Sequence, residues 1–507
     1  MAVLAAAAMT MPAVAAPAHA NPDPASLVAA VTADHIQRHV QALQSIADTH
    51  GGTRASGTSG YDASAQYVAG RLRSAGLNVA LQPFSFPFYQ ENAVGTLEQV
   101  SPESKSYAPT PPNGSTVGDF FTMIYSGAGD VRATVQSVDL PLPPTPTPSS
   151  TSGCETEDFA DFKAGNIALI QRGSCDFAVK AANAKTAGAA AVIIFNSGQP
   201  GRTGTIQATL GNPVGIPVVG TTFALGEDLA SPTGTVAHLK LDTTSEMRTT
   251  HNVIAESPGG DSGNVVMLGA HLDSVVAGPG INDNASGSVG LLEAALLTAK
   301  LKPHNKVRFA WWGAEEFGLR GSTEYVNALS ADQLGQVKLY LNFDMIASPN
   351  YALQVYDGDG SGGSGAPVGP PGSSDIEKNF QSYYETLGLR HTSAAFNGRS
   401  DYGPFIEKGI PAGGIFTGSD GLKTAEEQQL FGGTAGTPYD SCYHRSCDTA
   451  ANINAKALLV NTGAIVYATA TYAFDENLPG TGMKRTTGEK DTSSHNSHGE
   501  HDRELTR

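Results

Sequence analysis

The second half of the chain alternates between strand-like and helix-like segments, and this alternation limits the possible folds more than any other feature. From residue 251 onward, short apolar runs rich in Val, Ile and aromatic residues are followed by segments with helical periodicity. Strands are predicted at residues 252–257, 265–271, 306–313, 339–345 and 412–416, and helices at 287–300, 323–329, 375–387 and 453–474. Such alternation favours an α/β fold with a mixed, largely parallel central sheet that helices flank on both faces.

The first half of the chain changes in composition near residue 95. Helices are predicted at residues 32–47 and 61–75, and a strand at 77–86. Residues 95–244 are then rich in Val, Thr, Gly and Pro, and their pattern indicates short strands with one helix at 177–187. This stretch is predicted to be an inserted β-rich domain.

The two ends of the chain differ from the rest. Residues 1–20 are apolar and end in Ala-His-Ala, which is typical of a secretory signal peptide, although no Lys or Arg precedes Arg38. Residues 479 onward are polar, charged and free of aromatic residues, which indicates a disordered tail. The expected parts are a signal peptide (1–20), a first part of the main domain (21–95), the inserted domain (96–244), the rest of the main domain (245–478) and the tail (479–507). We therefore expect a secreted, extracellular protein.

The charge and the hydropathy of the chain exclude two classes of partner, nucleic acids and a spanned membrane. The formal net charge of −17 argues against a nucleic-acid partner. No run of about 18 or more apolar residues predicts a membrane span.

The four cysteines form two close pairs, Cys154 with Cys175 and Cys442 with Cys447, which suggests two disulfides in an exported chain. Metal ligation is the alternative, but neither pair has the C-x-x-C spacing of a zinc ribbon.

Acidic and histidine residues lie where predicted strands end. Two follow the strand at 265–271, two adjacent acids follow the strand at 306–313, and others lie in the tight turn GINDNASG and in NFDM. Sites in α/β sheets lie outside the carboxyl ends of the strands. Singly, each residue could instead be a helix cap, a turn former or part of a solvated helix start. The six residues are His271, Asp273, Asp283, Glu315, Glu316 and Asp344.

The chain resembles a known family at five segments, which follow one another in the same order: HLDS, GINDNASG, WWGAEEFGLRGS, NFDM and CYHRSCD. They are similar to those of the co-catalytic dizinc aminopeptidases, above all the secreted bacterial leucine aminopeptidases and aminopeptidase Y. The resemblance implies the zinc exopeptidase fold, two Zn²⁺ ions per chain and hydrolysis of the N-terminal residue of peptides. It also implies one role for each of seven residues: His271 and Asp344 bind one zinc, Glu316 and His444 bind the other, Asp283 bridges them, Glu315 is the general base toward a zinc-bound hydroxide, and Asp273 orients His271.

The chemistry of these residues agrees with the implied roles. Zinc binds neutral imidazole nitrogen and carboxylate oxygen, and a catalytic zinc keeps a position open for water. A carboxylate that accepts the second N–H of a ligating histidine fixes its tautomer. The family has a cis peptide after its bridging acid, which here would be Asp283–Asn284. Tyr443 would donate a hydrogen bond to the tetrahedral oxyanion, although packing alone is an equal alternative.

Residues of a substrate pocket follow from the same resemblance. Met345, Gly398, Arg399 and Phe416, together with Tyr443, would surround the first side chain of the substrate. A methionine and aromatic rings suit a large apolar residue such as Leu or Phe, and ordinary core packing is the alternative. A disulfide between Cys442 and Cys447 would hold the loop of Tyr443 and His444 rigid.

The inserted region resembles a protease-associated domain over residues 153–196, with Cys154–Cys175 as its disulfide. Such a domain would act as a lid over the active site or as a docking surface for substrates.

The function expected is a secreted zinc metalloaminopeptidase, a monomer whose partners are the N-termini of peptides or proteins. A carboxypeptidase or a single-zinc glutaminyl cyclase of the same fold is an alternative, as is a non-catalytic receptor. A carboxypeptidase needs cationic groups for a terminal carboxylate, and Arg399 is a lone candidate. A cyclase needs fewer metal ligands, and a receptor would be marked by the loss of ligands, whereas all are present here.

Overall fold

The computed structural model describes residues 22–112, 116–363 and 365–479. The predicted signal peptide lies outside the described residues, as does the predicted tail apart from Pro479. The α/β fold class is confirmed, with a mixed and mostly parallel sheet, flanking helices and an inserted domain.

The main domain is a sheet between two layers of helices. Its strands lie in the order β13-β12-β14-β11-β9-β10-β8-β1, and the pairs at its centre, β14–β11, β11–β9 and β9–β10, are parallel. Its elements are α1 (Pro24–Val28), α2 (Ala33–Thr49), α3 (Ser59–Ala75), β1 (Asn78–Ser101), β8 (Val236–Glu256), β9 (Asp261–His271), the π-type turn η2 (Ile281–Ser286), α6 (Gly287–Thr298), β10 (Asn305–Trp312), α7 (Arg320–Ala328), α8 (Ala331–Gln336), β11 (Val337–Phe343), β12 (Gln354–Tyr356), α9 (Ser373–Thr386), β13 (Thr392–Ala394), α10 (Tyr402–Glu407), β14 (Ala412–Phe416), α11 (Ala425–Phe431) and α12 (Ala455–Phe474).

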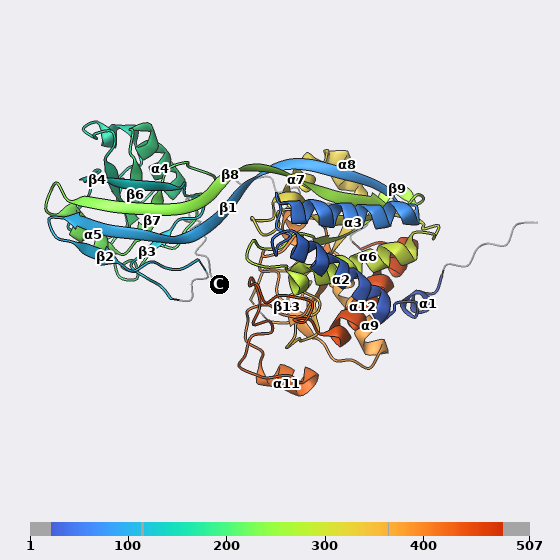
Figure 1. Cartoon of the computed structure of the whole chain (residues 1–507). Helices are drawn as coiled ribbons and strands as arrows, with labels where there is room; N and C mark the ends of the chain where they lie inside the picture. The colour runs from blue at the N-terminus through green and yellow to red at the C-terminus, as the bar shows by residue number, and fades with distance from the viewer. Residues whose placement is uncertain (1–21, 113–115, 364, 480–507) are drawn as a thin grey trace, which may run out of the picture.

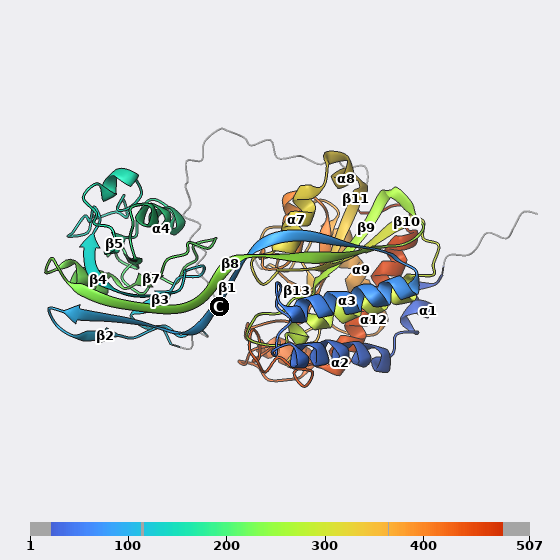
Figure 2. The same ribbon diagram turned by 45° about the horizontal axis from the view of Figure 1, so that its top comes forward.

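The central strands are apolar on both faces because helices cover both. Val266 and Leu268 of β9 join the core formed with α2, α3, α6, α9 and α12. Val265 and Met267 of the same strand point to the other face and join the core formed with α7, α8 and α10. Figure 2 shows α7 and α8 on the opposite side of the sheet from α2, α3 and α12. The continuous apolar run of β9 is therefore that of a strand buried on both faces.

Helix α12 is the one helix in the described ranges that is long and apolar enough to cross a membrane. It has 20 residues, and 72% of its most apolar window is buried inside the protein. Its side chains Leu458, Ile465 and Val466 belong to the main core. The helix is therefore a core helix of the main domain.

Strands β1 and β8 form a long antiparallel ribbon that joins the two domains (Figure 1). The ribbon pairs Asn78 with Glu256 at one end and Ser101 with Val236 at the other. The strand predicted at 77–86 was thus far too short. The prediction ended at residue 86, but the ladder continues past Pro87 and Gly95, with changes of register after Glu91.

The inserted domain extends the sheet in the order β8-β4-β5-β6-β7-β3. Its elements are β2 (Lys105–Tyr107), β3 (Phe120–Thr122), β4 (Gly129–Ser137), η1 (Thr156–Phe159), β5 (Ile167–Gln171), α4 (Phe177–Thr186), β6 (Ala191–Phe195), β7 (Val218–Thr221) and α5 (Phe223–Ala230). Helix α4 is the predicted one, whereas α5 was missed because its eight residues carry too short a periodic pattern. A disulfide joins Cys154 to Cys175.

Candidate active site

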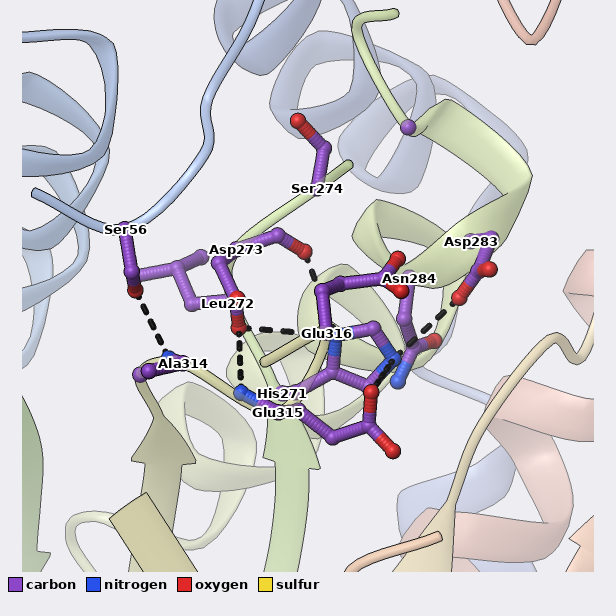
Figure 3. A network of polar contacts seen from close by, with 12 residues as sticks. Ser56, His271, Leu272, Asp273, Ser274, Asp283, Asn284, Ala314, Glu315 and Glu316 are labelled. Atoms are coloured by element: carbon purple, nitrogen blue, oxygen red, sulfur yellow. Dashed lines mark hydrogen bonds and ion pairs between the residues drawn. The ribbon is translucent and has the colours of Figure 1, made fainter. Parts of the chain in front are cut away.

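The parallel strands β9, β10 and β11 end at the same edge of the sheet, and the predicted metal ligands lie there. His271 is the last residue of β9, Asp344 follows β11, and Glu315 lies three residues beyond β10. The π-type turn η2 brings Asp283 to the same point, and Figure 3 shows Asp283, Glu315 and Glu316 around His271. The structure thus brings together side chains that are up to 173 positions apart in sequence, between His271 and His444.

The two carboxylate oxygens of Asp283 face two different imidazole–carboxylate pairs. Its Oδ1 lies 3.2 Å from Nε2 of His271, and that nitrogen lies 3.3 Å from Oδ1 of Asp344. Its Oδ2 lies 3.3 Å from Nε2 of His444, and that nitrogen lies 3.0 Å from Oε2 of Glu316. The five side chains therefore form two adjacent imidazole–carboxylate pairs, with Asp283 between them.

The donor set fits zinc in chemistry and in charge. Imidazole nitrogens and carboxylate oxygens are zinc ligands, and the trios His271–Asp283–Glu316 and His271–Glu315–Asp344 each lie close enough together to hold an ion. Within the described part of the chain, Oε1 of Glu316 is buried without a hydrogen-bond partner. Burial, together with neighbouring carboxylates, raises the pKa of Glu315 well above its usual range, and burial raises the pKa of Glu316 as well. Buried acids in this state are stabilised by a bound cation.

The backbone around the site adopts conformations that side-chain-bearing residues rarely take. Ala314, Met345 and His444 have φ angles of 54°, 47° and 57°, in the left-handed region. His444 is a predicted ligand, Ala314 directly precedes Glu315, and Met345 directly follows Asp344. Such strain persists where the surrounding structure enforces it, and it is found most often at functional sites. The peptide bond Asp283–Asn284 is cis, as the family resemblance implied.

Further residues hold these ligands in place. The hydroxyl of Ser400 donates to Oδ2 of Asp344 over 2.7 Å. The backbone N–H groups of Asn282 and Asp283 donate to the two oxygens of Asp448 over 2.8 and 3.0 Å. Neither Ser400 nor Asp448 was singled out from the sequence, although Ser400 directly follows the predicted pocket residues Gly398 and Arg399, and Asp448 lies within CYHRSCD.

Asp273 contacts its neighbours differently from the expectation. Nδ1 of His271 lies 3.1 Å from the backbone carbonyl oxygen of Asp273, closer than the 3.7 Å to its Oδ1. The carboxylate instead accepts the backbone N–H of Glu315 over 3.2 Å. Asp273 therefore contacts the His271 imidazole through its backbone carbonyl, and it holds the loop of Glu315 through its side chain.

A cavity of about 310 Å³ opens next to the metal ligands. Four of the predicted pocket residues line it, namely Met345, Arg399, Phe416 and Tyr443. Gly398 does not line the cavity, and its N–H donates to the hydroxyl of Tyr402 over 3.0 Å. Residues that also line it but were not predicted include Gln354, Tyr356, Ser393, Asn397, Tyr402, Asp420 and Tyr439.

The loop of Tyr443 and His444 is closed by the Cys442–Cys447 disulfide. The ring of Tyr443 stacks on that of His444, with their centroids 3.8 Å apart. Its hydroxyl accepts a hydrogen bond from Nη2 of Arg399 over 3.2 Å and faces the cavity.

Comparisons with known proteins agree with this geometry. The model of peptidase family M28 matches residues 252–469, and that of the PA domain matches residues 138–229. The chain is 46% identical over 469 residues to an aminopeptidase of Pseudomonas aeruginosa, covering 91% of this chain and 85% of the relative. It is 48% identical over 351 residues to leucine aminopeptidase 2 of Trichophyton rubrum, covering 68% of this chain and 69% of the relative.

Two solved structures share the fold over nearly the whole chain. An aminopeptidase from an Aneurinibacillus species has a TM-score of 0.62 at 27% identity and covers 90% of this chain and 97% of its own. A zinc aminopeptidase from Bacillus subtilis has a TM-score of 0.56 at 26% identity and covers 88% of this chain and 96% of its own.

Proposed function

The chain belongs to peptidase family M28 as a zinc aminopeptidase with an inserted PA domain, and we propose that it uses two zinc ions to remove large apolar N-terminal residues from peptides. The observation that carries the proposal is the position of Asp283. Its two oxygens face His271 with Asp344 on one side and His444 with Glu316 on the other. An acid between two such pairs is the arrangement of a two-metal site.

Five residues would hold the ions. His271 and Asp344 would bind one zinc, Glu316 and His444 the other, and Asp283 both. When bound, zinc supplies Lewis-acid activation of the scissile carbonyl and of a water molecule.

Glu315 is the proposed general base. Its Oε2 lies 4.0 Å from Nε2 of His271, farther than the oxygens of Asp283 and Asp344, so of these three acids it is the one farthest from that imidazole. Glu315 would accept the proton of the attacking water and return it to the leaving amine.

Tyr443 is proposed to stabilise the oxyanion. Burial and the nearby carboxylates raise the pKa of its hydroxyl well above the usual value, so the hydroxyl keeps its proton at neutral pH. Arg399 fixes the oxygen by donating to it, which leaves the Tyr443 proton free to point at the substrate.

The walls of the cavity support a large apolar first residue. Met345, Phe416 and Tyr356 are on its lining, and the rings of Tyr356 and Phe416 lie nearly parallel with centroids 6.5 Å apart. A Leu or Phe side chain would bury its apolar surface against them. The acids of the metal cluster would attract the free α-amine of the substrate.

We also propose that the enzyme acts outside the cell as a monomer. Both cysteine pairs form disulfides, which persist in oxidising compartments. The predicted signal peptide supports the same location.

Hydrolysis of Leu-p-nitroanilide tests the proposal. We expect release of p-nitroaniline, loss of release after a chelator removes the metal, and full recovery at two equivalents of zinc per chain. N-acetyl-Leu-p-nitroanilide is the control and should not be cleaved, because it lacks the free amine. Full recovery at one equivalent would contradict the two-ion site, and absence of release with two zincs bound would contradict the assigned activity.

A further inference from the structure

A short segment between α2 and α3 lies directly behind the metal ligands. It consists of residues 53–56, with the sequence Thr-Arg-Ala-Ser, and the side chains of Arg54 and Ser56 are completely buried. The metal-ligand scheme proposed above gives this segment no role. Burying an arginine is costly unless all its donors are satisfied, so the contacts of Arg54 indicate what it does.

The guanidinium of Arg54 donates only to backbone carbonyls of two ligand loops. Its Nε donates to Pro279 over 2.8 Å and its Nη2 to Gly280 over 2.6 Å. Its Nη1 donates to the carbonyl oxygen of Leu272. Leu272 separates His271 from Asp273, and Gly280 directly precedes the turn that carries Asp283. One side chain therefore connects the backbone at His271 to the backbone at Asp283.

The neighbours of Arg54 extend these contacts to a third loop. The hydroxyl of Ser56 accepts the N–H of Ala314 over 2.7 Å, and Ala314 directly precedes Glu315 (Figure 3). The hydroxyl of Thr53 donates to the carbonyl oxygen of Val275 over 3.0 Å. Three of the four residues, Thr53, Arg54 and Ser56, thus contact the loops of both acids of the WWGAEEF motif and of the first proposed histidine ligand.

From these contacts we infer that Arg54 is a positioning residue, which sets the separation of His271 and Asp283 and so the affinity of the site for metal. The inference rests on the proposed two-zinc site. Arg54 touches neither the substrate cavity nor a ligand side chain, so it acts through the backbone that it holds.

The positive charge of Arg54 also helps to hold the acidic side chains of the site together. Burial lowers the pKa of the guanidinium to about 10, while the carboxylates of Asp273, Asp448 and Asp283 raise it. Arg54 is therefore a cation at neutral pH, and it offsets part of the negative charge that the ligands bring together.

An arginine is required because three donors must reach three carbonyls at once. The guanidinium presents its N–H groups in a rigid planar fork, whereas a lysine has a single charged centre on a flexible chain. Arg54→Lys would keep the charge and lose the connection between the two loops. The same substitution at Arg308 of β10 is a matched control away from the metal ligands. The Arg308 side chain donates to Glu256 and Tyr325.

Zinc affinity, measured by competition with a chromogenic chelator, is the main readout, beside kcat, KM and thermal unfolding. For Arg54→Lys we expect zinc affinity to fall by about 10- to 100-fold, the range for outer partners of metal ligands, and kcat to fall with KM little changed. Arg308→Lys should lower the unfolding temperature and leave zinc affinity unchanged. If Arg54→Lys unfolds without metal, added zinc should restore its fold. Failure to fold at saturating zinc, or equal zinc affinity in the two variants, would overturn the inference.

Ser56→Ala gives a second, independent test of the segment. Its contact is to the loop that carries Glu315 and Glu316, so kcat should fall, and zinc affinity should fall less than in Arg54→Lys because Ser56 does not connect the loops of His271 and Asp283. Loss of zinc affinity as large as that of Arg54→Lys would contradict the separate roles. In each case the wild-type enzyme shows whether the underlying assignment holds: an inactive zinc-loaded wild type would contradict the proposed function, not the role of Arg54.

Discussion

At the residue scale, the site depends on an acid that faces two ways. Asp283 is held by its own backbone N–H, which donates to Asp448, and both its oxygens remain available to the two histidines. Among the described residues, His271 forms no ion pair with Glu316, and His444 forms none with Asp344. The separation of the pairs gives each acid a distinct effect on metal binding.

Substitution of the bridging and the non-bridging acid should therefore give different zinc contents. Asp283→Asn weakens the contact with both ions, so we expect zinc per chain after dialysis to fall below one. Glu316→Gln weakens only the ion shared with His444, so one zinc should remain. Elemental analysis of the dialysed proteins measures both. Equal zinc contents in the two variants would contradict the bridging role of Asp283.

The proposed metal ligands could be located from the sequence because each lies at a strand end, in a tight turn or in a segment that resembles the family. His271 and Asp344 end apolar strands, and Glu316 follows one, so strand prediction alone places them at one edge of the sheet. Arg54 could not be predicted in this way, because its partner Leu272 is 218 positions away and no local pattern joins them. Gln354 and Tyr356 of the cavity were missed for a similar reason, since their strand β12 has only three residues.

At the element scale, the packing of α2, α3 and α6 contains a buried histidine. Nδ1 of His39 in α2 lies 2.6 Å from the hydroxyl of Tyr67 in α3, and its Nε2 lies 3.8 Å from Oε2 of Glu293 in α6. Burial, with the positive charges of Arg71, His35 and Arg38, lowers the pKa of His39 from 6.5 to about 4. The folded protein therefore keeps this imidazole neutral in mildly acidic solution.

The lowered pKa makes stability depend on pH. Between pH 6.5 and 4 the unfolded chain binds a proton at this position and the folded chain does not. The stabilisation is complete above pH 6.5 and is lost as the pH falls, by about 2 kcal/mol between pH 7 and pH 5. The raised pKa of Glu293 acts in the opposite sense and reduces the slope.

His39→Gln should make the free energy of unfolding less sensitive to acid. The amide can still bond to Tyr67 but does not titrate, so the variant should lose less stability than the wild type on going from pH 7 to pH 5. Urea unfolding at the two pH values, with both proteins in the same zinc state, measures the difference. Identical losses in the two proteins would show that His39 does not carry this dependence.

Long helices and central strands were predicted well, and the connecting elements were not. Helices α2, α3, α6, α9 and α12 lie close to their predicted ranges. Helices α2, α3 and α9 each bury one periodic face, whereas α6 and α12 are long apolar segments buried on nearly all sides. Helices α8, α10 and α11 have six or seven residues and gave no such signal. The full length of β1 is set by its ladder with β8, a partner more than 130 positions away, so local composition ended it too early.

At the scale of the whole molecule, the inserted domain is attached through the β1–β8 ribbon and does not contribute to the cavity. Each of the described residues that line the cavity comes from position 271 or later. Tyr125 of the inserted domain contacts Arg320 at the start of α7, close to the ribbon. The small-substrate reaction should therefore be a property of the main domain.

Removal of the inserted domain tests this separation. Phe88 pairs with Glu246 across the ribbon, and Phe88 packs on Phe317 of the main domain, so an Asn-Gly turn between Phe88 and Glu246 would close a hairpin. We expect kcat/KM for Leu-p-nitroanilide to stay within about threefold of the full chain, a change of about 0.7 kcal/mol. A folded, zinc-loaded variant with a far larger loss would show that the inserted domain takes part in the small-substrate reaction.

The division of labour between Glu315 and Glu316 is the central claim, and Glu315→Gln measures it most directly. Zinc content and kcat should be determined on the same preparation. The account predicts two zincs per chain, as in the wild type, with kcat lower by about 10²- to 10⁴-fold, the range for loss of a general base. Unchanged kcat at full zinc content, or loss of a zinc ion from the variant, would contradict it.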